Sequence, residues 1–252
     1  MTVHRRSRVW VVLPAFNEEP SLAALFERIE ESMDEARLDY RVILVDDGSS
    51  DGTVAVAESF ADRMGLHIVR HPENEGLGAS IRDGLLTACQ AADPKDVLIT
   101  LDADNTHTPE LILRMVRMVR EGHDVVIASR YQPGSRVRGV PAARVLLSLA
   151  ASLLLRVVFP IKGVKDYTSG YRAYRAAVLQ EAVERSGTEW FSQEGFQVMV
   201  DILLKLSRDR SLIFGEAPMI LRYDMKEGVS KMDVGQTVAN TLRLVVRRRL
   251  GR

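Results

Sequence analysis

Asp102 and Asp104 stand two residues apart at the end of an apolar run, 97–101, and their spacing suggests chemistry. The run predicts a buried parallel strand, and open α/β sheets hold their ligands at the carboxyl ends of such strands. Carboxylate oxygens there suit Mg²⁺ or Mn²⁺, which completes its shell with diphosphate oxygens and water. Because Asp often caps a helix, a capping turn is the alternative. The pair predicts a cation site that the rest of the chain has to support.

A second acidic cluster follows the predicted strand 41–46. It is the run DDGSSDG, which begins with Asp46 and Asp47. One of these carboxylates can accept a hydrogen bond from a nucleobase N–H, and the two glycines that follow, Gly48 and Gly52, let backbone approach a ligand closely. An ordinary turn with a helix cap is the alternative, since Asp-Gly is a frequent turn dipeptide.

The first predicted strand also ends in polar residues, in the run PAFNEE over 14–19. Its Asn17 and Glu18 are either ligand contacts or the start of a capped helix. Three strand ends rich in acids and amides, with no Gly-x-Gly-x-x-Gly after the first strand, argue against a dinucleotide site. They favour a metal-bound nucleoside diphosphate.

These residues depend on a regular alternation of strands and helices. Apolar runs predict strands over 8–14, 41–46, 66–70, 96–102 and 124–129, and helical patterns lie between them over 21–36, 53–64, 77–91 and 109–121. Strict alternation is typical of a parallel sheet with right-handed crossovers. We expect Thr108 to be the N-cap of the last helix, with Pro109 at its first position. After Arg130 the pattern changes, and we expect the sheet to end there.

The bulk composition fits one large core with a C-terminal elaboration. The chain has 252 residues, of which 46% are hydrophobic, and its 34 lysines and arginines balance 34 aspartates and glutamates. This balance gives no global field for nucleic acid, but the arginines gather in the second half and indicate an anionic surface or substrate there. The single cysteine, Cys89, excludes an intramolecular disulfide and suits a reducing cytosol. It falls within a predicted helix and is expected to be a small residue of the protein core.

Two segments bear on membranes. The apolar run at the N-terminus stops at Pro14 and predicts a strand, and the longest apolar stretch, 145–155, is shorter than the roughly 20 residues that a spanning helix needs, so no transmembrane helix is expected. The segment 141–160 is either an interfacial helix or a core helix. The tail 237–252 predicts a basic amphipathic helix for anionic headgroups, or else a solvated helix end.

A resemblance becomes specific when the motifs are taken together. Five of them follow one another in order: VVLPAFNEE (11–19), VDDGSSDGT (45–53), RHPENEGLGASIRDG (70–84), LDADNTHTPE (101–110) and ASRY (128–131). Their succession resembles glycosyltransferase family 2. Farther on, DYTSGYRAYR (166–175), GFQVMVDILLK (195–205) and LRYDMKEGVSK (221–231) make the chain similar to the polyprenyl-phosphate sugar synthases, among them the dolichol-phosphate mannose synthases. The resemblance covers nearly the whole chain. It implies the α/β GT-A fold, an open and mostly parallel sheet flanked by helices, with C-terminal amphipathic interfacial helices.

The resemblance implies a role for each matching residue. For the nucleoside and donor it implies Pro14, Ala15, Asn17, Glu18, Asp46 or Asp47, and Gly78. For the cation and the diphosphate it implies Asp102, Asp104 and Thr106. For the acceptor phosphate it implies Arg130, Arg144 and Arg222, which together with Asp104 would be the catalytic residues. For a turn that shapes the sugar pocket and a loop that closes over the donor it implies Asp166, Ser169, Ser230 and Lys231.

The chain departs from the family at one place. The best-known relatives follow the Asp-x-Asp with Leu-Gln, whereas Asn105 and Thr106 stand here, so the third protein ligand stays open between Thr106 and water. For Arg144, a snorkelling residue on an amphipathic helix is the alternative. Asp201, where relatives tend to carry glutamate, is expected to be an ion-pair partner and not a base.

The predicted activity is inverting, Mg²⁺- or Mn²⁺-dependent transfer of a hexose, mannose or glucose, from a GDP- or UDP-sugar to a polyprenyl phosphate. A phosphate acceptor is already ionised at neutral pH and needs no general base. We expect residues 1–135 to bind the nucleotide sugar, 136–232 to bind the acceptor and 233–252 to form the basic helix. The enzyme would lie peripherally on the cytoplasmic face of a membrane, or dock on a membrane protein partner.

Two alternatives stay open at the level of sequence. One is a soluble family 2 transferase with a hydroxyl acceptor and a carboxylate base, for which Asp166 is the candidate. The other is a nucleotidyltransferase or a non-catalytic nucleotide-sugar-binding protein.

Overall fold

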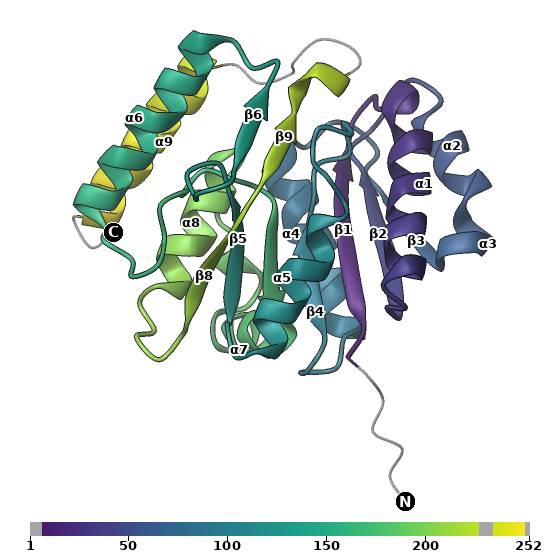
Figure 1. Cartoon of the computed structure of the whole chain (residues 1–252), viewed down its shortest axis with the longest axis horizontal. Coiled ribbons are helices and arrows are strands. Elements are labelled where there is room, and N and C mark those ends of the chain that lie inside the picture. The colour runs from purple at the N-terminus through teal and green to yellow at the C-terminus, as the bar shows by residue number, and fades with distance from the viewer. Residues whose placement is uncertain (1–6, 227–233, 250–252) are drawn as a thin grey trace, which may run out of the picture.

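A computed structural model describes residues 7–226 and 234–249. Within these ranges one seven-stranded sheet has the order β3-β2-β1-β4-β7-β5-β8 (Figure 1). Its strands are β1 (Val9–Ala15), β2 (Tyr40–Asp46), β3 (Leu66–Arg70), β4 (Val97–Thr100), β5 (Val125–Ser129), β7 (Arg172–Arg175) and β8 (Phe214–Pro218). Only β7 runs antiparallel to its neighbours among the described strands. The predicted α/β class and mostly parallel sheet are confirmed.

Helices cover both faces of this sheet, which explains why its strands are apolar on both sides. In β1, Val9, Val11 and Leu13 join one core cluster, while Trp10 and Val12 join the other. The first cluster takes its helical side chains from α1 (Glu19–Glu35), α2 (Thr53–Ser59), α3 (Ala61–Met64) and α5 (Leu111–Arg120). The second takes them mainly from α4 (Leu77–Ala91), α7 (Ala176–Ser186) and α8 (Gln197–Leu206). Cys89 is buried in α4, as predicted.

The second half adds elements outside the main sheet. A short parallel pair joins β6 (Arg136–Arg138) to β9 (Ile220–Arg222), and the 3₁₀ turns η1 (Thr188–Trp190) and η2 (Tyr223–Met225) follow α7 and β9. The helices α6 (Ala142–Val158) and α9 (Val234–Arg249) lie side by side beyond the end of the sheet (Figure 1).

Three expectations about elements were wrong. The sheet continues past Arg130, because β7 enters between β4 and β5 and β8 pairs with β5. The helix expected over 53–64 is interrupted at Phe60, whose ring packs on Phe26 with 5.2 Å between centroids. Thr108 is not the N-cap of α5: its carbonyl oxygen accepts hydrogen bonds from Leu111 N and Tyr171 Oη, which makes a turn before the helix begins.

Helix α6 is mostly exposed. Its buried residues are Ser152 and Leu155, while Leu146 is 66% exposed and Val157 is 74% exposed. The core-helix alternative for this segment is therefore excluded. Among the described helices, none is both long enough and apolar enough to cross a bilayer.

Candidate active site

The polar residues singled out in the sequence meet at one edge of the sheet. The strands β1, β2, β4, β5 and β8 are parallel and end at this edge, and the antiparallel β7 begins there. Segments far apart in sequence, 14–19, 46–53, 101–107, 130–131 and 166–171, therefore converge (Figure 1). This is the position at which open α/β sheets bind their ligands.

Asp104 is held by two donors from this chain. Its Oδ1 accepts a hydrogen bond from Thr106 Oγ1 over 2.7 Å, and its Oδ2 lies 2.5 Å from Nζ of Lys226. Burial raises the pKa of the Asp104 carboxyl, but the Lys226 charge outweighs it and the net direction is downward. Asp104 is thus kept ionised.

Asp102 has a different environment. Burial raises its pKa, the charge of His107 opposes the rise and that of Asp104 adds to it. Nδ1 of His107 lies 3.8 Å from Asp102 Oδ2, and the ring stacks on Tyr171 with 5.1 Å between centroids. That Nδ1 is buried, and no hydrogen-bond partner for it exists among the residues that the structure describes.

The donor set fits a hard divalent cation. Asp102, Asp104 and the Thr106 hydroxyl offer oxygen atoms, and a buried nitrogen without a partner lies beside them. Residues 7–226 and 234–249 contain no cluster of three acids, histidines or cysteines arranged to bind a metal. Two carboxylates are the usual protein share for Mg²⁺, whose shell is otherwise filled by phosphate and water.

Asn105 is turned away from this donor set. Its backbone adopts the left-handed conformation, with φ of 58°, and its Oδ1 accepts a hydrogen bond of 2.8 Å from Arg28 on α1. Of the two residues that replace Leu-Gln, only Thr106 therefore contacts the Asp-x-Asp carboxylates.

Asp46 and Asp47, both buried, differ in how much of their hydrogen-bonding capacity is used. Asp47 accepts 2.9 Å hydrogen bonds from the backbone N–H groups of Glu75 and Gly76, and its Oδ1 lies 2.8 Å from Nδ1 of His71. Asp46 accepts a single, longer bond of 3.3 Å from Ser49 N within the described residues. Asp46 is therefore the better candidate to receive a base N–H.

The end of β1 lies at the same edge of the sheet. Ala15 is the register partner of Asp46, and Pro14 precedes it in the strand. Asn17 has φ of 50°, and its Oδ1 accepts a 2.8 Å hydrogen bond from Ser50 N, which ties the first two strand-end loops together. Glu18 is buried and donates its backbone N–H to Thr53 Oγ1.

Gly78 has a packing role. A Cβ at this position in α4 would lie 2.2 Å from the carbonyl oxygen of Gln193. The glycine thus lets α4 approach the loop 193–195 closely. Its predicted donor contact stays a prediction.

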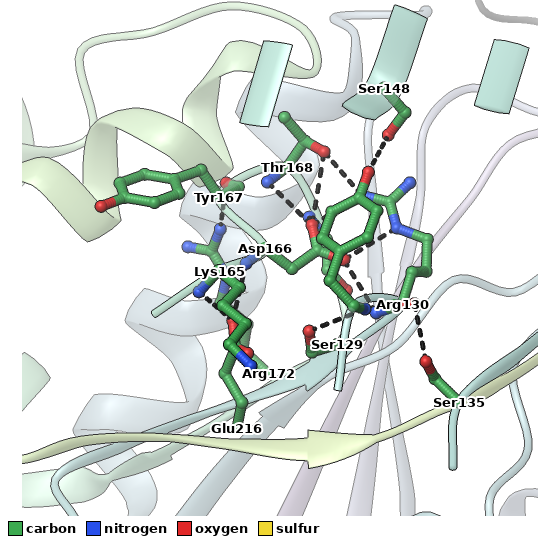
Figure 2. Close-up of polar contacts among 12 residues, drawn as sticks. Ser129, Arg130, Ser135, Ser148, Lys165, Asp166, Tyr167, Thr168, Arg172 and Glu216 are labelled. Carbon is green, nitrogen blue, oxygen red and sulfur yellow. Dashed lines mark hydrogen bonds and ion pairs between the residues drawn. The ribbon is translucent and has the colours of Figure 1, made fainter. Parts of the chain in front are cut away.

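Arg130 and Asp166 form a buried ion pair (Figure 2). Asp166 is fully buried and accepts hydrogen bonds from Nε and Nη2 of Arg130 over 2.8 and 2.6 Å. Burial raises the pKa of Asp166, but the charge and hydrogen bonds of Arg130 outweigh it and lower the pKa below its ordinary value. Glu216 accepts hydrogen bonds from the backbone N–H groups of Lys165 and Asp166 and fixes the turn.

The other two arginines lie on the second half. Nη1 of Arg144 donates to the hydroxyl of Tyr223 over 2.7 Å, while the Arg222 side chain pairs with Asp224 at 3.0 Å. The backbone N–H of Arg222 donates to the carbonyl oxygen of Thr106, which joins β9 to the Asp-x-Asp loop. Of the remaining predicted positions, Ser169 is buried beside Asp166 and donates its N–H to it. Ser230 and Lys231 lie outside the described residues.

Sequence reasoning missed four residues that complete the site: Arg28, His71, Tyr223 and Lys226. Lys226 lies in the same sequence motif as Arg222, four residues later. A second basic side chain in that motif, to which no role was given, was the clue that could have identified it. The ion-pair role expected for Asp201 is confirmed, because Lys205 and Arg248 lie 2.9 and 2.6 Å from its carboxylate.

Comparison with known proteins agrees with this geometry. Residues 10–182 match the sequence profile described as glycosyl transferase family 2. The polyprenol monophosphomannose synthase of Mycolicibacterium smegmatis is 32% identical over 233 residues, which cover 92% of this chain and 83% of that protein. A dolichol-phosphate mannosyltransferase of Pyrococcus furiosus is 32% identical over 199 residues, which cover 79% of this chain but only 53% of that longer protein.

Among solved structures, the glucosyl-3-phosphoglycerate synthase of Mycobacterium tuberculosis, in complex with Mn²⁺, UDP and phosphoglyceric acid, aligns with a TM-score of 0.67 at 21% identity. The alignment covers 97% of this chain and 79% of that one. At this level of identity it shows a shared fold and no more. With a profile match over most of its length and relatives above 30% identity, the chain belongs to glycosyl transferase family 2.

Proposed function

We propose that this glycosyltransferase moves a hexosyl group, mannosyl or glucosyl, from a GDP- or UDP-sugar to a polyprenyl phosphate at a membrane surface, with inversion of configuration. One observation carries the proposal. The helix α6 directs Arg144 to Tyr223, which lies three residues before Lys226, the residue that contacts Asp104. The same helix exposes Leu146 and Val157 to solvent. A single element thus joins a phosphate-binding side chain to a surface suited to lipid.

On the donor side, the loops after β1 and β2 would hold the nucleoside. Asp46 would accept a base N–H, and the small side chain of Ala15, in register with it, would leave room for the ring. Asp102, Asp104 and Thr106 would hold Mg²⁺ or Mn²⁺, which, when bound, supplies positive charge that stabilises the leaving diphosphate.

On the acceptor side, Arg130, Arg144 and Arg222 would orient a phosphate oxygen in line with the anomeric carbon. Planar guanidinium groups grip phosphate oxygens well. Nε and Nη2 of Arg130 donate hydrogen bonds to Asp166. These two bonds fix the orientation of the guanidinium group. Positioning and electrostatics would then provide the rate enhancement.

The environment of Asp166 favours a phosphate acceptor over a hydroxyl acceptor. A general base must accept a proton near neutral pH, and its pKa should lie near the working pH. Asp166 is fully buried, paired with Arg130 and has a lowered pKa. It is therefore poorly suited to the role that a hydroxyl acceptor would require of it.

The relatives support the choice of sugar and lipid. The names of the Mycolicibacterium and Pyrococcus proteins specify mannose and a polyprenol or dolichol phosphate. We carry mannose and a polyprenyl phosphate over to this chain as the first pair to assay, with both nucleotide bases tested.

The lipid-facing surface that we propose is the outer face of α6 and α9. Its exposed apolar side chains are Val145, Leu146, Leu147, Leu149, Leu153, Leu154, Val157, Leu242 and Val246. Exposed arginines border it at Arg156, Arg243 and Arg247. Apolar area combined with arginine is the composition of interfacial helices, so we assign the enzyme peripherally to a membrane, on the cytoplasmic side that the unpaired Cys89 favours.

The test is a transfer assay. The protein is incubated with GDP- and UDP-hexoses, polyprenyl phosphate in phospholipid vesicles, and either Mn²⁺ or a chelator. We expect a lipid-linked sugar with one donor, no product with the chelator and none with Asp104→Asn. Full transfer to a water-soluble acceptor without vesicles would refute the lipid acceptor, and full activity with the chelator would refute the cation.

A further inference from the structure

Both carboxylate oxygens of Asp104 are already engaged by side chains of this chain. Thr106 Oγ1 lies 2.7 Å from Oδ1, and Lys226 Nζ lies 2.5 Å from Oδ2. The side chains of Lys226 and Asp104 are 12% and 14% exposed. A charge-assisted contact that is this well sheltered from water is strong.

The two donors differ in what they can do when a cation arrives. A hydroxyl can rotate its hydrogen away and offer an oxygen lone pair, so Thr106 can stay beside a metal ion. An ammonium has three donors and no acceptor, so Lys226 can never be a ligand. Two positive charges a few ångströms apart also repel, which means that a divalent cation on Oδ2 and the ammonium of Lys226 exclude each other.

The released ammonium would stay close to the site. The backbone N–H of Lys226 donates to the carbonyl oxygen of Tyr223, and its Nζ lies 5.9 Å from the centre of the Tyr223 ring. The hydroxyl of the same tyrosine accepts a hydrogen bond from Arg144. A long flexible stem anchored at this turn keeps the ammonium close to Asp104, beside which the proposed function places the diphosphate of the donor.

We propose that Lys226 is an exchangeable counter-ion of the cation site. It neutralises Asp104 in the cation-free enzyme, leaves that carboxylate when the divalent cation binds, and then pairs with the diphosphate of the donor. The inference rests on the proposed function, because it takes Asp104 as a cation ligand and a nucleoside diphosphate as the anion. In this role Lys226 has two effects. It lowers the affinity of the empty site for the cation, and it positions the diphosphate once the cation is bound.

The test compares Lys226→Met, which removes the charge at similar length, with Lys226→Arg, which retains a cation. Lys162→Met is the matched control, because Lys162 is exposed and its loss changes net charge equally. Binding of Mn²⁺ alone is followed by the loss of its free electron paramagnetic resonance signal. We expect Lys226→Met to bind Mn²⁺ about tenfold more tightly than the unmodified protein, because no ammonium has to be displaced.

A second measurement adds GDP or UDP in the presence of saturating Mn²⁺. Lys226→Met should bind the nucleoside diphosphate about tenfold more weakly, since the ammonium that would pair with it is gone. Lys226→Arg and Lys162→Met should both stay close to the unmodified protein. Thermal unfolding with and without Mn²⁺ guards against misfolding, and Mn²⁺ should raise the midpoint of Lys226→Met more than that of the unmodified protein.

The outcomes separate the inference from the proposed function. If Asp104→Asn abolishes Mn²⁺ binding but Lys226→Met binds Mn²⁺ no more tightly than the unmodified protein, the counter-ion role is wrong and the cation site stands. If Asp104→Asn binds Mn²⁺ normally, the cation site itself is wrong and the counter-ion role falls with it.

Discussion

Nδ1 of His71 lies 2.8 Å from Oδ1 of Asp47, and both side chains are buried. Nε2 of the same ring lies 3.0 Å from Asp83, so the imidazole bridges two carboxylates. Both nitrogens donate only in the imidazolium form. Burial would lower the pKa of His71, but the hydrogen bond and charge of Asp47 outweigh it and raise the pKa above 6.5. The imidazolium of His71 holds Asp47 in place, and under the proposed function Asp46 would be the carboxylate that receives the nucleoside.

This bridge makes stability depend on pH. Because the pKa of His71 is higher in the folded than in the unfolded protein, its protonation stabilises the fold fully below about pH 6.5. That contribution is lost as the pH rises through the folded value. We expect His71→Gln to lower the free energy of unfolding by about 1–2 kcal/mol at pH 6, with a smaller gap at about pH 9. Urea unfolding at both pH values measures it, with the exposed His67→Gln as control. A gap that does not change with pH would contradict the bridge.

The Arg130–Asp166 pair should stabilise the folded protein, in addition to the role in acceptor binding that we propose for Arg130. Asp166→Ala leaves the guanidinium of Arg130 without its partner in a mostly buried position, and loss of one member of such a pair costs about 3–5 kcal/mol. The control is Glu181→Ala, which breaks an exposed pair with Arg185 and should cost less than about 1 kcal/mol. Denaturant unfolding compares the two. Equal losses would show that the buried pair contributes no more than a surface pair.

Gly48 is expected to tolerate no side chain. Its φ is 72°, and a Cβ there would lie 2.5 Å from the backbone carbon of Glu73. Gly65 is the matched control, because its φ is 56° but its Cβ would meet only the flexible end of Arg41. Gly65→Ala should cost about 1 kcal/mol in the free energy of unfolding, and Gly48→Ala clearly more. Nucleotide binding should fall only in Gly48→Ala, and calorimetric titration with GDP and UDP checks this.

The outer face of α6 should mediate attachment to vesicles. Leu146→Gln combined with Val157→Gln removes two of its most exposed apolar side chains and should reduce partitioning into anionic phospholipid vesicles by about tenfold or more. Because both positions are exposed, the free energy of unfolding should change by less than about 1 kcal/mol. Ile213→Gln, at a 54% exposed site outside α6 and α9, is the control and should sediment with vesicles as the unmodified protein does. Unchanged partitioning of the double variant would refute the assigned surface.

Local patterns were sufficient for much of the fold. The strand β3 and the helix α4 have the predicted bounds, because an apolar run and a helical period each ended at turn residues. The strand β7 was not predicted. Its sequence, RAYR, has no apolar run, and its first residue is an arginine that is fully buried and donates to the carbonyl oxygens of Met199 and Tyr167. Only pairing with β4 and β5, which sequence does not reveal, makes it a strand.

In the site, the residues at the ends of strands were predictable from the sequence, but their long-range partners were not. Asp102 and Asp104 follow from one strand and its ending. The partner of Asp104 lies 122 residues away in sequence, and no local period relates Lys226 to it. The choice between Asn105 and Thr106 depends on a left-handed backbone at Asn105 and on Arg28 from another helix, both of which are properties of the folded chain.

The position of β7 has a consequence for how such enzymes diversify. The chain leaves the sheet after β5 and returns as β7, and these two strands are neighbours, with Ile127 paired to Arg172. The whole excursion, 130–171, therefore begins and ends at one fixed point of the sheet. Under the proposed function, insertions, deletions or exchanges inside it, including α6, would alter acceptor binding and leave the loops after β1 and β2 unchanged, because both ends of the segment are fixed by backbone pairing. One closed segment of the chain could then change its acceptor without any change in the rest of the sheet.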